Sequence, residues 1–442
     1  MKKAISFLTV VTLLLVTLSV LGGCNKESSD TIYYLNFKPE TADAYKEIAK
    51  VYKEEKGIEL KVVTAASGTY EQTLKSEMAK SSAPTIFQVN GPKGYANWKN
   101  YCKDIKDTAI YNALTDKDLA IKDGDGVYAV PYVVEGYGII YNAEILDKYF
   151  ALKNKKVDIK SADEIKNFAT LKAVVEDMTA HKKELGIKGV FGSTSLKAGE
   201  DWRWQTHLAN IPLHYEFEKN NTDLTKDAAK EINFEFSENY KNIFDLYINN
   251  SVTEKNLLGS KTVADSMAEF ALGECAMIQN GNWAWSQIKD VSGNTVKEEN
   301  IKFLPIYTGV KGEESQGLCI GTENYLCINK NASEHQQKLA EEFLYWLYSS
   351  ETGKKLVTEK LDYITPFSTF NENEAPTDPL AKEIIRYMND DQLKTIPWNF
   401  TIFPSQTFKE NFGASLLNYA RGSKTFEDVK NDMVTDWKKE YR

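Results

Sequence analysis

The chain has 442 residues, a length typical of two domains or of one large body with two lobes. Its composition, 42% hydrophobic and 26% charged, is ordinary for a water-soluble globular protein. A net charge of −9 argues against a nucleic-acid partner, and the four scattered histidines show no metal-binding spacing, so we expect neither a metal nor a cofactor.

The first 24 residues have the pattern of an export signal. Lys2 and Lys3 precede an apolar stretch over residues 4–21, which runs into Leu21-Gly22-Gly23-Cys24. Small residues before a cysteine are typical of a bacterial lipobox, in which the thiol of the first mature residue receives a lipid. The alternative, an uncleaved membrane helix, needs about 20 apolar residues.

These features predict how the chain is processed and where it resides. We expect a signal peptide over residues 1–23, lipidation of Cys24 and a polar tether over 24–30. The mature protein is then an exported lipoprotein, held by its lipid at the extracytoplasmic face of the cell membrane.

Short strands alternate with amphipathic helices at the start of the mature chain. Strands are predicted at 32–37, 58–63 and 85–89, with helices that open at Thr41 and Tyr70 between them. This order is typical of a mostly parallel sheet with helices on its faces.

The segment Asp123-Gly124-Asp125-Gly126 is similar to a calcium loop at first sight. Its twelfth position is Val134, where an EF-hand needs glutamate, so the calcium pattern fails. We expect a tight hairpin turn there instead.

A second α/β region follows. Ser161-Ala162-Asp163-Glu164 has the spacing of a capping box for a long helix that reaches about Leu185, and a strand is expected near 190–192. The last third is mostly helical, with helices expected at 334–348, 351–359, 380–387, 408–419 and 426–440. Since no long linker is visible, two lobes of this chain have to share several crossings.

Four further cysteines lie among apolar or aromatic neighbours: Cys102, Cys275, Cys319 and Cys327. Buried free thiols that act as small hydrophobes are the expected state. An even number in an exported protein also permits disulfides, and their spacing leaves any pairing open.

One segment resembles a known family. Residues 276–288, with the letters AMIQNGNWAWSQI, are similar to the hinge-strand motif of family 1 extracellular solute-binding proteins, which include the maltose-binding protein. Residues 303–306 and 340–344 resemble later segments of that family, and 33–40 and 136–142 resemble its first strand and a strand that crosses between lobes.

The resemblance implies a fold class and a function. The fold is α/β, of the periplasmic-binding-protein type II, with two lobes joined by a multi-strand hinge and a ligand cleft between them. The first lobe is expected to comprise 31–138 and 282–328, and the second 139–281 and 329–442. The implied function is capture of an oligosaccharide for an ABC importer, with permease subunits and a separate ATPase as partners and no catalytic residues.

Trp283 is the leading candidate for ligand contact. It follows Asn280-Gly281-Asn282 at the end of a predicted strand, where loops of α/β sheets meet their ligands. An indole can stack on the apolar face of a sugar ring while amides and carboxylates bind its hydroxyls. The alternative is a core tryptophan, which is the expected role of Trp285.

Other candidate ligand contacts follow predicted strands, lie at predicted helix starts or in strands expected at the hinge, or, for Trp398, follow Pro397 in the carboxyl-terminal part. They are Asn36, Lys38, Glu40, Tyr70, Asn90, Tyr137, Trp202, Trp204, Asn280, Glu323 and Trp398. Of Trp202 and Trp204, at least one is expected to face the cleft. Helix capping, core packing and solvated loop positions are the competing roles for these residues.

Two other functions are compatible with parts of the sequence. The same fold can hold a polyamine or a metal complex, which the acidic balance and the 24 tyrosines permit. A lipid-anchored glycoside hydrolase needs two carboxylates that flank the scissile bond, and the sequence does not pair any.

Overall fold

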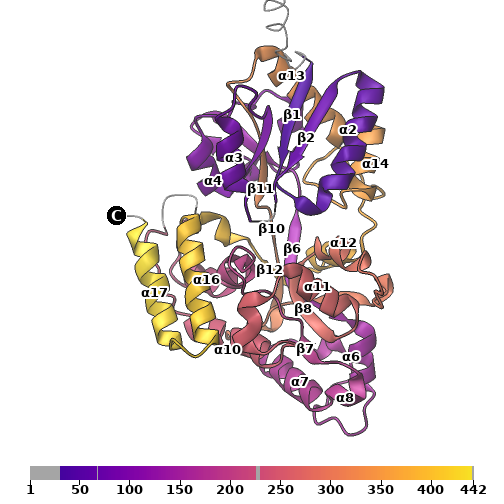
Figure 1. The fold of residues 1–442 in the computed structure, drawn as a ribbon, viewed down its shortest axis with the longest axis vertical. Coiled ribbons are helices and arrows are strands. Elements are labelled where there is room, and N and C mark those ends of the chain that lie inside the picture. The colour runs from indigo at the N-terminus through magenta and orange to yellow at the C-terminus, as the bar shows by residue number, and fades with distance from the viewer. Residues whose placement is uncertain (1–29, 67, 225–228, 441–442) are drawn as a thin grey trace, which may run out of the picture.

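The computed structural model describes residues 30–66, 68–224 and 229–440. The chain folds into two lobes, each built on a sheet of six strands (Figure 1). The predicted leader, Cys24 and almost all of the tether lie outside the described residues. In the part of the chain that is described, no helix combines the length and the apolar character that a membrane crossing needs.

The first sheet has the order β2-β1-β3-β11-β5-β4. Its strands are β1 (Thr31–Asn36), β2 (Glu59–Thr64), β3 (Ile86–Asn90), β4 (Ile121–Asp123), β5 (Gly126–Pro131) and β11 (Asn324–Ile328). The three strands predicted at the start of the mature chain are therefore confirmed to within a residue. β1 is parallel to β2 and β3, whereas β11 is antiparallel to β3 and β5, so the expected mostly parallel sheet is mixed.

Helices cover both faces of this sheet. They are α2 (Ala42–Lys56), α3 (Tyr70–Met78), α4 (Gly91–Trp98), α5 (Ala109–Asn112), α13 (Glu334–Ser349) and α14 (Glu351–Glu359). In Figure 1, α3 and α4 lie on one side of the strands and α2 with α14 on the other. The predicted hairpin turn at 123–126 is confirmed, because β4 and β5 are antiparallel neighbours.

The second sheet has the order β12-β10-β6-β8-β7, and β9 pairs with β6. Its strands are β6 (Glu135–Asn142), β7 (Gly189–Phe191), β8 (Cys275–Gly281), β9 (Ile301–Leu304), β10 (Gln316–Gly321) and β12 (Lys394–Ile396). β6 leads from the first lobe into the second and is antiparallel to β8, β9 and β10.

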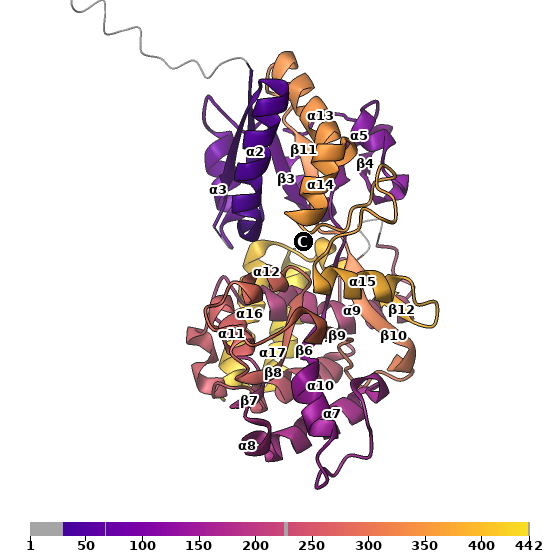
Figure 2. The same ribbon diagram turned by 90° about the vertical axis from the view of Figure 1, so that its right-hand side faces the viewer.

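The helices of the second lobe surround this sheet (Figure 2). They are α6 (Ala143–Phe150), α7 (Phe168–Ala180), α8 (Lys182–Leu185), α9 (Asn210–Lys219), α10 (Ser237–Asn249), α11 (Val263–Ala271), α12 (Ala284–Lys289), α15 (Pro379–Met388), α16 (Gln406–Ala420) and α17 (Phe426–Lys439). Short 3-10 turns lie at Pro39–Thr41, Lys117–Leu119, Ala162–Glu164, Lys255–Ser260, Glu298–Asn300, Glu313–Ser315 and Asn399–Ile402.

The capping box expected at Ser161 is wrong. The Ser161 side chain caps nothing, and residues 162–164 form a single 3-10 turn. The helix begins at Phe168 instead, where the Asn167 side chain accepts a hydrogen bond of 2.9 Å from Thr170 N. A helix cap requires extended backbone directly before a continuing helix, and the chain satisfies this at Asn167.

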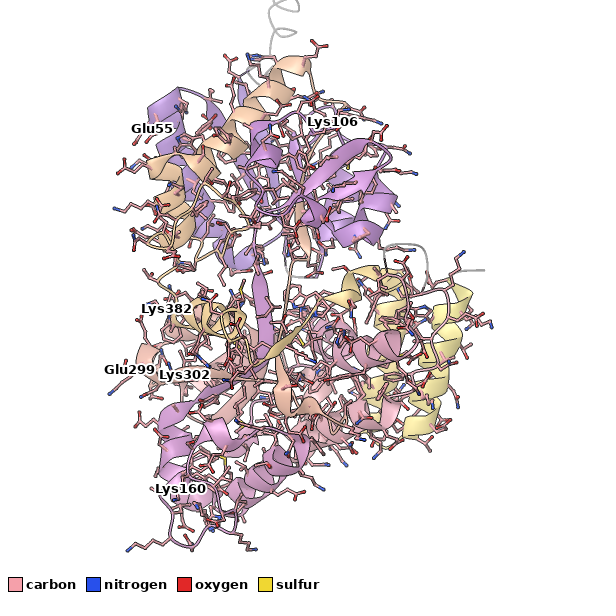
Figure 3. All side chains as sticks on the ribbon, turned by 180° about the vertical axis from the view of Figure 1, so that it is seen from behind. Glu55, Lys106, Lys160, Glu299, Lys302 and Lys382 are labelled. Atoms are coloured by element: carbon pink, nitrogen blue, oxygen red, sulfur yellow. The ribbon has the colours of Figure 1, made fainter. Side chains whose placement is uncertain are left out.

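The packing also corrects the expected lobe boundaries. α13 and α14 were assigned to the second lobe, but their apolar residues belong to a core of the first, with Ile32, Tyr45 and Leu326. β9 and β10 were assigned to the first lobe, but they are strands of the second sheet. Lys302 on β9 lies 3.5 Å from Glu383 on α15, and Figure 3 shows Lys302 and Lys382 together on the lower lobe.

The cysteines expected to be buried thiols are confirmed as such. Cys102, Cys275, Cys319 and Cys327 are all free and buried. Burial raises the pKa of the Cys319 thiol to about 12, so it is uncharged at neutral pH.

Candidate functional site

Three antiparallel strands bring their ends to the junction of the lobes. Tyr137 on β6 is paired with Gly281 on β8, and Gly136 on β6 is paired with Ile320 on β10. The chain leaves β8 into Asn282-Trp283, where the Asn282 side chain accepts a hydrogen bond of 2.9 Å from Gly136 N. We call the residues gathered at these strand ends the interlobe site.

Three tryptophans form one cluster in the interlobe site. The ring of Trp283 lies 5.9 Å from that of Trp202 and 6.3 Å from that of Trp398. Tyr137 and His207 fill the space between them, with their ring centres 4.6 Å apart. The three indoles come from positions 202, 283 and 398, so the fold gathers parts of the chain that are distant in sequence.

Two glycines of the crossing strands make room for these indoles. A Cβ atom at Gly281 would lie 2.1 Å from the Trp283 ring, and one at Gly321 would lie 2.9 Å from Trp398. Both contacts are closer than real Cβ atoms tolerate. Because Gly281 on β8 and Gly321 on β10 have no side chains, the rings of Trp283 and Trp398 can pack directly on the backbone of these strands.

A π-helix over Arg203–Leu208 carries two further residues of the cluster. Helices of this kind are rare and occur often at functional sites. The Arg203 guanidinium stacks 3.9 Å above the Trp202 ring, and its Nε donates to Asn280 Oδ1 over 3.2 Å. His207 is buried, and burial lowers its pKa, so its imidazole is neutral at pH 7.

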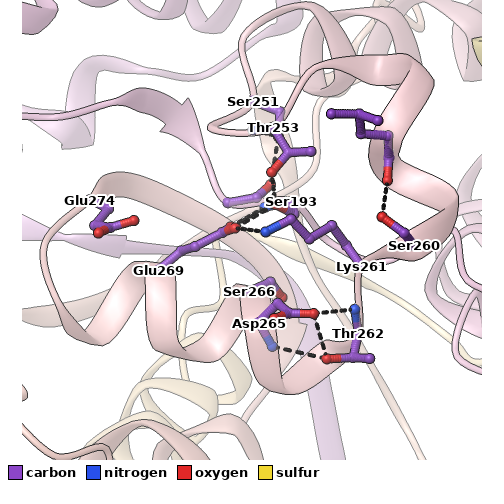
Figure 4. Close-up of polar contacts among 12 residues, drawn as sticks. Ser193, Ser251, Thr253, Ser260, Lys261, Thr262, Asp265, Ser266, Glu269 and Glu274 are labelled. Atoms are coloured by element: carbon purple, nitrogen blue, oxygen red, sulfur yellow. Dashed lines mark hydrogen bonds and ion pairs between the residues drawn. The ribbon is translucent and has the colours of Figure 1, made fainter.

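A hydrogen-bond network in the second lobe supports this π-helix. Glu269 on α11 accepts bonds from Ser193 Oγ (2.7 Å) and Lys261 Nζ (3.2 Å), as Figure 4 shows. The two residues after Ser193 are Thr194 and Ser195. Their backbone carbonyl oxygens accept hydrogen bonds from Trp204 Nε1 at 2.9 and 2.8 Å. Trp204 thus fixes the helix from within the core while Trp202 lies at the interlobe site.

A buried ion pair joins the loop after β1 to the start of β6. Lys38 follows β1, and its Nζ lies 2.6 Å from Glu135 and 3.8 Å from Glu40. Lys38 and Glu135 are 5% and 3% exposed. Burial lowers the pKa of Lys38, but Glu135 and Glu40 outweigh it and raise the pKa, so the amine stays charged. The same Nζ lies 5.7 Å above the Trp283 ring, which connects the two sides of the site.

Glu323 lies where β10 passes into β11. Its carboxylate accepts from Asn90 Nδ2 over 3.3 Å, and its carbonyl accepts from Gly91 N over 3.0 Å. Burial raises the pKa of Glu323 to about 7. Lys409 on α16 lies near enough to act on this carboxylate electrostatically, although burial lowers the pKa of the lysine.

The lobes also come close together at two glycines of the first lobe. A Cβ at Gly68 would lie 2.7 Å from the carbonyl oxygen of Gly199, and one at Gly91 would lie 2.6 Å from the Thr401 side chain. Gly68 and Gly91 belong to the first lobe, and both have positive φ angles of 72° and 62°. These close approaches need residues without side chains.

Buried polar atoms without a hydrogen-bond partner gather at the interlobe site. Among the described residues they include Asn90 Oδ1, Arg203 Nη1, His207 Nε2, Thr322 Oγ1 and Trp398 Nε1. Most buried polar groups in proteins are paired, and each unpaired group costs about 1–3 kcal/mol. Both lobes thus present donors and acceptors that the protein itself does not satisfy.

The structure brings most of the sequence-predicted residues together. Those at the interlobe site are Lys38, Glu40, Asn90, Tyr137, Trp202, Asn280, Trp283, Glu323 and Trp398. Trp285 lies in a core of the second lobe, as predicted.

Three predicted residues have other roles. Asn36 is fully buried, and its side-chain amide donates to Lys38 O (2.9 Å) and Thr41 Oγ1 (3.0 Å), so it shapes the loop after β1. The Tyr70 hydroxyl accepts from Gln88 N (2.7 Å) within a core of the first lobe. Trp204 is 1% exposed and packs on Phe244 and Tyr247.

Sequence reasoning missed four residues of the site: Glu135, Arg203, His207 and Lys409. Glu135 directly precedes the segment that resembles the family's crossing strand, and Arg203 lies between two candidate tryptophans. Their position next to candidate residues is the signal that could have identified Glu135 and Arg203 from the sequence. Nothing local distinguishes His207 or Lys409 from other residues of their helices.

A family model described as "Bacterial extracellular solute-binding protein" matches residues 47–384 of the chain. The chain belongs to this family. It is a family of binding proteins and not of enzymes, as the sequence predicted.

Solved structures share the fold. The chain is similar to a chitin oligosaccharide binding protein, with a TM-score of 0.69, 19% identity and coverage of 93% of this chain and 98% of that one. It is also similar to the solute-binding protein RafE in complex with raffinose, with a TM-score of 0.68, 19% identity and coverage of 93% and 100%. The predicted fold class, the two-lobed type II fold, is confirmed.

A curated relative matches part of the chain. The melibiose/raffinose/stachyose-binding protein MelE of Bacillus subtilis (strain 168) is 28% identical over 175 residues. The match covers 37% of this chain and spans 40% of the length of that protein.

Proposed function

We propose that this solute-binding protein captures an oligosaccharide at the interlobe site and delivers it to the permease of an ABC importer. The observation that carries the proposal is the cluster of Trp202, Trp283 and Trp398, which faces charged and amide groups from the first lobe. Aromatic planes suit the apolar faces of sugar rings, and the polar groups suit their hydroxyls.

The names of the relatives support the same ligand class. MelE is named for melibiose, raffinose and stachyose, RafE was solved with raffinose, and another structure belongs to a chitin oligosaccharide binding protein. Each of these ligands is a saccharide with several hydroxyl groups.

The unpaired polar atoms suggest how binding closes the lobes. With the lobes in contact, Asn90 from the first lobe and Arg203, His207 and Trp398 from the second each leave a polar atom unpaired. A ligand that pairs with them favours the closed form over the open form, and this difference in affinity drives closure. The ligand therefore has to contact both lobes.

A thermal-shift panel tests the ligand class. Neutral and acidic oligosaccharides, polyamines and ferric citrate are compared, and isothermal calorimetry follows for each hit. We expect the melting temperature to rise with oligosaccharides, because ligands that bind only the folded state stabilise it. A rise with a polyamine or ferric citrate alone would contradict the proposal and favour the non-sugar alternative.

Lipid anchoring at Cys24 completes the proposed function, since a captured solute has to reach a permease in the membrane. We expect Cys24→Ala to block lipidation and processing at residue 24, and to move the mature protein out of the detergent phase. Phase partitioning and mass spectrometry of the N-terminus provide the measurement. A mature-sized product of this variant that stays in the detergent phase would exclude Cys24 as the anchor.

A further inference from the structure

Arg203 carries a buried charge without a carboxylate partner. The residue is 1% exposed, and no carboxylate oxygen of the described residues lies within 4 Å of its nitrogens. Its hydrogen bond within the described chain runs from Nε to Asn280 Oδ1, and Nη1 has no partner. Burial lowers the pKa of Arg203 to about 10, although Tyr137, Glu200 and Glu40 act in the opposite direction.

Lys38 differs from Arg203 in having carboxylate partners in direct contact. Lys38 contacts Glu135 at 2.6 Å, and Lys409 acts on Glu323. Glu40, Glu135 and Glu323 therefore each have a lysine nearby. Arg203, stacked on the Trp202 ring, has Glu200 and Glu40 near enough to act on it electrostatically, but no carboxylate of the described residues forms an ion pair with it.

The guanidinium is held in a fixed orientation. Asn280 Oδ1 accepts from Arg203 Nε and also from Gly281 N over 3.0 Å, so the amide cannot turn away. Trp202 covers one face of the guanidinium at 3.9 Å. With Nε and one face occupied, the free edge is the pair of terminal nitrogens, whose spacing matches the two oxygens of a carboxylate.

We propose that Arg203 determines specificity and that the ligand is an acidic oligosaccharide, in which the carboxylate of one sugar residue accepts hydrogen bonds from the terminal nitrogens of Arg203. The proposal rests on the proposed function, because it assigns the ligand class of the same site. A hexuronic acid and a sialic acid both provide this carboxylate. The ligand binds Arg203 while the lobes are open and is enclosed when they close.

The first test uses the unaltered protein. Trigalacturonic acid and 3′-sialyllactose are each compared with their methyl esters by calorimetry at pH 7, since an ester removes the charge and keeps the sugar. We expect one of the two acids to bind at least about tenfold more tightly than its ester. The acid that binds identifies the carboxylate source.

The same experiment separates the two proposals. If esters and neutral oligosaccharides such as raffinose bind as tightly as the acids, the inference about Arg203 is overturned and the proposed function stands. If no saccharide binds, the proposed function fails and the inference fails with it.

Variants assign the effect to Arg203. Arg203→Gln is expected to lower the acid-to-ester affinity ratio to about one. Arg203→Lys is expected to keep part of this ratio, because lysine retains the charge but lacks the pair of terminal nitrogens. Arg386→Gln is the matched control, since Arg386 lies 2.9 Å from its own carboxylate partner, Glu383.

The ratio distinguishes ligand recognition from a structural role. If Arg203 merely holds Trp202 in place, Arg203→Gln weakens the acid and the ester equally, and that result overturns the inference. Both ligands are measured on the same folded sample, and a circular dichroism melt checks its stability. We also expect the acid-to-ester ratio to fall as salt rises, because salt screens the charge interaction.

Discussion

The two sides of the interlobe site are built from different chemistry. On the first lobe, short loops after β1 and β3 present charged and amide groups, among them Lys38, Glu40 and Asn90. On the second lobe, the site is mainly aromatic, with Trp202, Trp283 and Trp398 around a neutral His207. Under the proposed function, the second lobe would provide the surface for sugar rings and the first lobe the hydroxyl contacts.

Because of this difference, we expect substitutions on the first-lobe side mainly to lower stability and substitutions on the second-lobe side mainly to lower ligand affinity. A charge removed from the first-lobe side leaves its buried partner unpaired, which mainly costs folding free energy. An aromatic ring removed from the second-lobe side is expected mainly to cost affinity, because under the proposed function these rings stack on the ligand. Substitutions on each side test this distinction.

The largest effect on folding is expected at Lys38. Lys38→Met leaves the buried Glu135 carboxylate without its 2.6 Å partner, which costs about 3–5 kcal/mol in the free energy of unfolding. Urea denaturation measures this loss. Adding Glu135→Leu is expected to recover part of it, because an apolar pair leaves no buried charge. A single variant as stable as the original would show that the ion pair is not structural.

Gly281→Ala is expected to disturb the second-lobe side. The new Cβ would lie 2.1 Å from the Trp283 ring, so the ring has to move, at a cost of about 1–3 kcal/mol in stability together with a loss of affinity. Gly317→Ala on β10 is the control, since its Cβ would have no neighbour closer than 3.3 Å. Equal effects of both substitutions on oligosaccharide binding would contradict a special role for Gly281.

Trp283→Ala removes one stacking plane and leaves the strands in place. We expect a loss of about tenfold or more in affinity, from a stack of about 1 kcal/mol and the water that replaces it. Stability is expected to change little, because the ring is half-buried. Trp204→Ala is the contrasting variant, with an expected loss of about 3–5 kcal/mol in stability. Unchanged affinity in Trp283→Ala would show that this ring recognises nothing.

The smallest expected effect is on pH dependence. Burial raises the pKa of Glu323 from 4.5 to about 7, so the folded state binds more protons than the unfolded state between these pH values. Stability then falls as pH rises through this window, with a slope of at most about 1.4 kcal/mol per pH unit for one group. Urea melts between pH 4 and 8 measure the slope, and Glu323→Gln is expected to flatten it. An unchanged slope in that variant would assign the proton to another group.

Much of the architecture could be predicted from the sequence. The helices of the last third were expected nearly at their observed bounds, because apolar residues recur there with the period of a helix and caps such as Ser333 and Thr425 mark their starts. Trp283 was a candidate because it follows a predicted strand, Trp202 because it lies at a predicted helix start, and Trp398 because it follows Pro397. Local signals of this kind act over a few residues and do not depend on the rest of the chain.

The tertiary structure decided which candidates meet. Trp202 and Trp204 have the same side chain two positions apart, and the helical backbone at the start of the π-helix directs one to the interlobe site and the other into the core. The lobe boundaries followed the packing of α13 and α14, which return to the first sheet after β11. Such choices depend on which apolar faces find a partner across the fold.

The sequence by itself determined the alternation of strands and helices and the family resemblance, since both depend on local patterns of residues. It did not determine the partners of the charged side chains. Lys38 and Glu135 are 97 positions apart, and Arg203 and Asn280 are 77 apart. Their contacts exist because β6, β8 and β10 end at one place, and strand order is set by packing of the whole sheet, which no local pattern specifies.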